Sequence, residues 1–196
     1  MSHHIYNTEG FVLNSQNVGE ANKYFQIFTK DFGVVGAMAQ GVRHLRSKLR
    51  YSLQDYSYSK ISLVRGKHIW RIIGAIKEKN LYDTLKGQGK FELLTKVFSL
   101  LNRLVRGEEK NEELFNHLFF ACEFLETEEL DRDSSRNCEY ILVMRILQSL
   151  GYLGDSKNFK EFVDSSVWTK ELVSKMGSVG RGAVSQINKA LKETQL

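Results

Sequence analysis

The spacing of apolar residues changes once along this chain, close to residue 80. Up to Lys77 the apolar stretches are short, alternate with polar residues and are rich in β-branched and aromatic side chains, which is typical of strands. The expected strands are Tyr6 to Leu13, Lys23 to Thr29, Val34 to Ala39, Tyr56 to Val64 and His68 to Lys77. Five short strands separated by Gly-containing turns predict a small β-barrel of the OB type.

After Asn80 the apolar residues recur every three or four positions, as in amphipathic helices. One helix is marked by Phe91, Leu94, Phe98, Leu101 and Val105, and the next by Leu114, Leu118, Cys122 and Leu125 beside Phe115 and Phe119. A third is expected to begin at the capping cluster Asp133-Ser134-Ser135 and to stop at Gly151. Shorter helices are expected over 159–163, 167–176 and 183–192, with the glycines at 177, 180 and 182 forming a turn between the last two.

These patterns predict a multidomain α+β protein. Residues 1–78 form the expected five-stranded OB-type barrel, a nucleic-acid-binding domain, and residues 79–196 form an all-α helical domain for protein interactions. The chain has 196 residues, of which 42% are hydrophobic, enough for a core without disulfides. Cys122 and Cys138 match no disulfide framework or metal-ligand pair and fit a reducing cytosol. With no leader and no apolar run long enough for a bilayer, we expect a soluble, unexported protein.

Charge is distributed unevenly between the two parts. Residues 1–77 carry eleven Lys and Arg against four Asp and Glu, whereas the remainder carries 17 against 19. A basic module joined to a nearly neutral one indicates that the first meets a polyanion. Ordinary solubility is the alternative explanation.

The most informative segment is Gly41 to Arg50, which contains four cations and a histidine and no acidic residue. Such a cluster can neutralise several phosphates and release their counterions. Arg65, Lys67 and His68 lie in the expected turn between the last two strands, a loop that borders the binding face of this type of barrel. For both basic loops, the alternative explanation is an ordinary solvated loop. Tyr51, directly beside the basic segment, is the aromatic residue expected to stack on a base, while most other aromatics of this domain are expected in the core.

The sequence gives little support for a catalytic site or for a metal or cofactor site. The Gly87–Lys90 segment lacks the spacing of a phosphate-binding P-loop and is interpreted as a linker before a helix. An acidic run at 123–133 is interpreted as a solvated surface. We therefore predict no catalytic residues, no metal site and no cofactor.

The order of features in the first domain resembles the amino-terminal domain of the bacterial recombination mediator RecO family. The matching features are Gly10-Phe11-Val12-Leu13, Gly19-Glu20-Ala21-Asn22-Lys23, Ile27-Phe28-Thr29, Phe32-Gly33-Val34-Val35-Gly36-Ala37, Gly41-Val42-Arg43 with Arg46-Ser47-Lys48-Leu49, and Arg65-Gly66-Lys67. In the second domain Ile141 to Leu150 followed by Gly151-Tyr152-Leu153 is similar to a family helix that ends in Leu-Gly-Tyr. The four-cysteine zinc module and the proline that many members carry beyond this helix are missing from this sequence.

The resemblance implies a non-enzymatic mediator of recombinational DNA repair in the bacterial cytosol, associated with the nucleoid. It implies binding of single- and double-stranded DNA, strand annealing, and assistance in loading the recombinase RecA onto single strands covered by single-strand-binding protein. The implied partners are RecR and the acidic C-terminal tail of single-strand-binding protein, and Arg103, Arg106 and Arg145 are candidate contacts for that tail. The expected DNA-binding residues are Arg43, His44, Arg46, Lys48, Arg50, Tyr51, Arg65 and Lys67.

Two other functions stay open on the residues alone. The barrel could be an adaptor whose basic loops meet an acidic protein. It could also bind RNA, because phosphate contacts identify neither base nor sugar.

Overall fold

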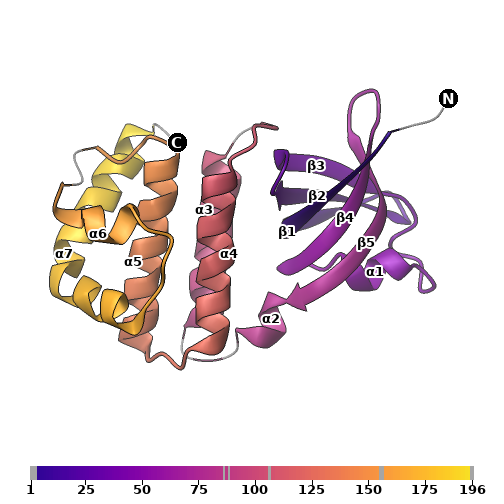
Figure 1. Cartoon of the computed structure of the whole chain (residues 1–196). Helices are drawn as coiled ribbons and strands as arrows, with labels where there is room; N and C mark the ends of the chain where they lie inside the picture. The colour runs from indigo at the N-terminus through magenta and orange to yellow at the C-terminus, as the bar shows by residue number, and fades with distance from the viewer. Residues whose placement is uncertain (1–3, 86, 88, 106, 155–156, 195–196) are drawn as a thin grey trace. The chain divides into compact units, whose positions relative to one another are not determined.

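The computed structural model describes residues 4–85, 87, 89–105, 107–154 and 157–194. The chain divides into two compact units, a β-rich one and a helical one (Figure 1). The first unit contains Met1–Thr84 and also Val105–Glu112, a later segment that returns to it. The sequence pattern did not indicate this return. Among the described residues no helix has both the length and the apolar character needed to cross a membrane.

Five strands form the first unit. They are β1 (Ile5–Val18), β2 (Asn22–Thr29), β3 (Gly33–Ala39), β4 (Ser57–Arg65) and β5 (Trp70–Asn80). Their order is β1-β2-β3-β5-β4 in a closed barrel, with a short parallel pairing between β3 and β5 and antiparallel pairing elsewhere. The fold expected from the sequence, an OB-type β domain followed by helices, is confirmed.

The strand β1 makes this closure possible because it pairs along both edges. Its first half pairs with β4 and its second half with β2, and the two pairings overlap at Gly10 and Phe11. The register with β2 shifts between Val12 and Asn14, and such an irregularity bends a strand. A Cβ atom at Gly10 would come within 2.7 Å of Ile27 Cγ2. The glycine that opens the Gly10-to-Leu13 motif therefore allows a close approach of strands in the barrel.

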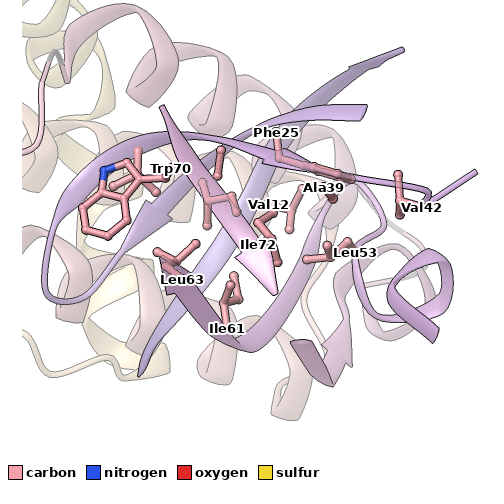
Figure 2. Packing of buried hydrophobic residues seen from close by; sticks show 12 residues of the cluster. Val12, Phe25, Ala39, Val42, Leu53, Ile61, Leu63, Trp70 and Ile72 are labelled. Carbon is pink, nitrogen blue, oxygen red and sulfur yellow. The ribbon is translucent and has the colours of Figure 1, made fainter. Parts of the chain in front are cut away.

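The core of the barrel consists of the inward-facing residues of all five strands (Figure 2). Its members include Val12, Phe25, Ile27, Val35, Ile61, Leu63 and Ile72, together with Val42 and Leu53 from the connection after β3. Tyr6 meets Trp70 and Phe32 edge to face, at ring-centroid distances of 5.3 and 5.6 Å. Most aromatics of this unit are thus structural, as the sequence predicted.

The connection between β3 and β4 contains the helix α1 (Lys48–Ser52), which the sequence pattern did not indicate. This helix is only five residues long, too short for a periodic apolar face to be visible in the sequence. A further short helix, α2 (Leu81–Thr84), follows β5.

The second unit is helical. Its elements are α3 (Lys90–Leu104), α4 (Glu112–Thr127), α5 (Arg132–Ser149), the 3₁₀ turn η1 (Lys157–Phe159), α6 (Lys160–Val163) and α7 (Lys170–Glu193). The helix α5 begins earlier than predicted, because the carboxylate of Asp131 accepts a hydrogen bond from Ser134 N at 2.7 Å and is the N-cap.

The predicted stop at Gly151 is confirmed, and its geometry explains the Leu-Gly-Tyr pattern. Gly151 has a positive φ of 74°. Its N–H donates to Gln148 O, and the Tyr152 N–H donates to Leu147 O, which is the Schellman arrangement that ends a helix.

The predicted break within the last helix is wrong. The helix α7 runs without interruption through Gly177, Gly180 and Gly182 and packs against α5. A Cβ atom at Gly177 would lie 3.1 Å from Asn137 Nδ2, and one at Gly180 would lie 3.6 Å from the ring of Tyr140. Glycine weakens an isolated helix, but here packing against α5 outweighs that local preference.

We expect Gly180→Ala and Gly151→Ala to change stability in opposite directions. Alanine at 180 meets only ordinary van der Waals contacts and should raise the free energy of unfolding by about 0.5–1 kcal/mol. Alanine at 151 must adopt a left-handed conformation and should lower it by about 1–2 kcal/mol. Denaturant unfolding followed by circular dichroism at the helix band measures both changes. A loss of stability in both variants would contradict the packing described for α7.

The imidazole of His117 in α4 makes the helical unit sensitive to pH. Burial lowers the pKa of His117 below 6.5, the positive charge of Arg145 acts in the same direction, and Glu113 at 3.5 Å opposes both. The folded state therefore prefers neutral His117, while the unfolded chain takes up a proton as the pH falls through 6.5.

Stability contributed by neutral His117 is thus present above the unfolded pKa and is lost as the pH falls toward the folded pKa. We expect wild type to lose more stability than His117→Gln between about pH 7.5 and about pH 5, with a difference of up to about 1.4 kcal/mol per pH unit within that window. Unfolding midpoints across the pH series test this, and parallel profiles for the two chains would count against it.

Candidate nucleic-acid interface

Hydrogen bonds hold the start of the basic segment against the turn between β1 and β2. The Gly41 N–H donates to Asn22 Oδ1 at 2.9 Å, and the Arg43 N–H donates to Ala21 O at 2.9 Å. The Arg43 guanidinium donates to Gly19 O, also at 2.9 Å. Gly41 has a positive φ of 63°, which explains a glycine at this position. The Gly19-to-Lys23 motif and the Gly41-to-Arg43 motif are therefore two sides of one local structure.

The cations that follow face solvent. Arg43, His44, Leu45 and Arg46 lie in the loop after β3, and Lys48, Arg50 and Tyr51 lie in α1. All of these side chains are exposed. In the described part of the chain no carboxylate lies within 4 Å of the five basic side chains. Positive charge without close carboxylate partners is available to an anionic ligand.

Two arginines of the basic segment and a lysine from the strand β2 line one hollow of about 450 Å³. Arg43, Arg50 and Lys23 all line it. Lys23 is the second residue of β2 and pairs in register with Ala39, the last residue of β3, so the sheet brings it to the start of the basic segment. Lys23 was not among the predicted site residues, because only the strand register reveals its position. Asp55 also lines the hollow, so an acidic residue is closer to the basic segment than its local sequence indicated.

Tyr51 projects into solvent beside a further cation. Its side chain is 68% exposed, and Lys77 Nζ lies 3.5 Å from the centroid of its ring. The same ammonium group donates to Gln54 Oε1 at 3.3 Å. Lys77, from β5, was also absent from the predicted site. One face of the Tyr51 ring therefore carries a cation, and a base could stack only on the other.

The second predicted basic loop has a different environment. Arg65 forms a salt bridge with Glu108 at 3.2 Å, and its guanidinium lies over Trp70 at 5.3 Å. The indole Nε1 of Trp70 donates to the same carboxylate at 2.9 Å. Lys67 is exposed at the tip of the hairpin. In Figure 1 this hairpin, between β4 and β5, lies well apart from α1, so the predicted residues do not form one continuous cluster.

A family model and several known relatives match this chain. Residues 1–77 match the family model described as "Recombination protein O N terminal". The chain is 26% identical over 130 residues to "DNA repair protein RecO" of Alkaliphilus metalliredigens, which covers 66% of this chain and 53% of that protein. It is 29% identical over 156 residues to the protein of the same name from Thermodesulfovibrio yellowstonii, covering 78% of this chain and 60% of that one. With the relative from Thermoanaerobacter the match extends over 82% of this chain at 24% identity.

These matches confirm the resemblance seen in the sequence motifs. The chain spans only 53% of the length of the relative from Alkaliphilus metalliredigens and 60% of that from Thermodesulfovibrio yellowstonii.

The structure predicts unequal roles for Arg46 and Arg65. Arg46→Ala should lower affinity for a labelled single-stranded oligonucleotide several-fold and reduce the salt slope by about 0.7, as expected for one lost phosphate contact. Arg65→Ala should change affinity much less, because Glu108 already neutralises that side chain. Fluorescence anisotropy over a salt series measures both. Equal losses for the two variants would show that Arg65 leaves Glu108 when nucleic acid binds.

Proposed function

We propose that the protein acts in DNA repair and recombination by binding DNA, without catalysing a reaction, as the match of residues 1–77 to the RecO amino-terminal family model implies. The observation that carries the proposal is the exposed basic segment from Arg43 to Arg50. The backbone N–H groups of Gly41 and Arg43 donate to Asn22 and Ala21, and the Arg43 guanidinium donates to Gly19 O, so the start of the segment is held on the barrel before a ligand arrives. A preorganised site loses less conformational entropy on binding.

The chemistry of the segment favours binding without sequence specificity. Arginine and lysine side chains on an exposed loop suit phosphate oxygens, which carry no base information. Such contacts serve single and double strands alike. Tyr51 adds an exposed ring on which an unpaired base can stack, a contact worth about 1–3 kcal/mol. This combination supports binding of both forms of DNA and the annealing of complementary strands.

We further propose that the helical unit serves the protein partners implied by the family, RecR and the acidic tail of single-strand-binding protein, during loading of a recombinase in the bacterial cytoplasm at the nucleoid. Of the candidate tail contacts, Arg103 is exposed on α3 and lines a hollow of about 370 Å³ with Lys96. Arg145 is fully buried, so it is not available as a surface contact and this candidate is wrong. Arg106 lies outside the described residues.

The decisive variant replaces the four cations of the segment with alanine, at Arg43, Arg46, Lys48 and Arg50. Wild type should bind a labelled single strand tightly at low salt. The variant should lose most of that affinity, and its salt slope should fall by about 3, since each phosphate contact to a single strand contributes about 0.7.

A matched control removes the same charge from the helical unit, at the exposed residues Lys160, Arg181, Lys189 and Lys192. This control should retain nearly the wild-type salt slope. If both quadruple variants behave alike, only net charge matters and the proposed interface is wrong. Competition with a matched RNA strand distinguishes DNA from RNA binding, and failure of wild type to bind at low salt would favour the adaptor function instead.

A further inference from the structure

The acidic run of the helical unit borders an apolar hollow. The hollow has a volume of about 390 Å³, and four of its lining residues are apolar: Phe120, Phe124, Val167 and Trp168. Phe120 is 42% exposed and Val167 is 61% exposed. Large apolar side chains that gather at one exposed place on a unit mark an interaction surface.

A buried arginine holds the floor of this hollow in place. The Trp168 ring stacks on Phe124 at a centroid distance of 5.5 Å, and it lies 4.6 Å from the guanidinium carbon of Arg145. Arg145 donates through Nε to Phe162 O at 2.7 Å and through Nη2 to Val167 O at 3.0 Å. Burial lowers the pKa of Arg145 to about 10, so the group stays charged at neutral pH. The floor is therefore preorganised, which is characteristic of binding sites that accept an apolar anchor.

The rim determines which charge the ligand can carry. Residues 120–129 contain four glutamates and no lysine or arginine. Glu123 and Glu128 line the hollow itself, and Lys170 contacts Glu128 at 2.7 Å. An acidic peptide would meet like charge here. The hollow suits a ligand that places an apolar side chain between cations.

The chain itself presents such a ligand on the barrel. Leu45 is 87% exposed, more than any other large apolar side chain among the described residues. It lies between Arg43 and Arg46, in a ten-residue segment with four cations and no acid. We propose that the hollow of the helical unit binds the loop around Leu45 of a second copy of this chain, with Leu45 between Phe120 and Val167 and the arginines against the glutamate rim.

A contact of this kind is heterologous, since the two copies use different surfaces. A single loop in a hollow of this size buries far less than the roughly 1,200 Å² of a stable interface, so the association is weak and reversible. High salt should dissolve it, because its polar part lies at an exposed rim. Where the proposed function also holds, nucleic acid and the second copy compete for the same loop.

Sedimentation velocity over a concentration series tests the contact without any nucleic acid, so its failure is separate from failure of the proposed function. At low salt, wild type should show a mass that rises with concentration above the 22.6 kDa of the monomer. In about 1 M salt, where the screening length is about 3 Å, it should return to monomer. Wild type that stays monomeric at low salt and at the highest concentration would overturn the proposal.

Two variants make the test specific. Leu45→Ser removes the anchor and keeps the hollow, whereas Val167→Arg blocks the hollow and keeps the loop. Each alone should remain monomeric. Mixed together, they should form a one-to-one species of twice the monomer mass and nothing larger, because one intact loop meets one intact hollow. This recovery also shows that both variants are folded.

The matched controls replace exposed apolar residues elsewhere, with Ile76→Ser on the barrel and Val179→Arg on α7. Both controls should associate as wild type does. Association that persists in Leu45→Ser alone, or that is lost equally in the controls, would refute the assigned contact.

Discussion

Backbone pairing of β1 along both of its edges is the constraint on which the first unit depends. β1 reaches β4 with its first half and β2 with its second, and the short pairing of β3 with β5 closes the sheet into a barrel. The antiparallel pairing of β2 with β3 places the start of β2 beside the end of β3. The basic segment therefore emerges next to the turn between β1 and β2, and the hydrogen bonds from Gly41 and Arg43 to that turn follow from the topology.

The two units use arginine in opposite ways. On the barrel, Arg46 and its neighbours are exposed, where a guanidinium keeps its hydration until it meets an anion. In the helical unit Arg145 is buried and donates from Nε and Nη2 to the backbone carbonyls of Phe162 and Val167. A buried charge of this kind is costly to leave without hydrogen bonds. Its role is therefore structural, which a count of basic residues in the sequence could not show.

Periodicity predicted the existence of the five strands and the main helices, because these depend on local alternation of apolar and polar residues, although β1 runs to Val18, beyond its predicted end at Leu13. The basic segment was predicted from its charge. It failed where tertiary packing overrides local preference. Gly177, Gly180 and Gly182 predicted a turn, yet α7 is continuous and packs closely against Asn137 and Tyr140 of α5. Lys23 and Lys77 were not predicted as site residues. They are far from the basic segment in the sequence, and only strand pairing brings them to the candidate site.

A cluster of cations does not by itself choose between a phosphate backbone and a carboxylate surface, and both chemistries are relevant to the loop around Leu45. Charge density decides between them. Duplex DNA carries one charge about every 1.7 Å along its axis, whereas two glutamates line the hollow of the helical unit and one of these contacts Lys170. Nucleic acid at equal concentration should therefore displace the second copy. Leu45 narrows this difference in affinity without reversing it, because an exposed leucine gains from an apolar floor and gains nothing from phosphate.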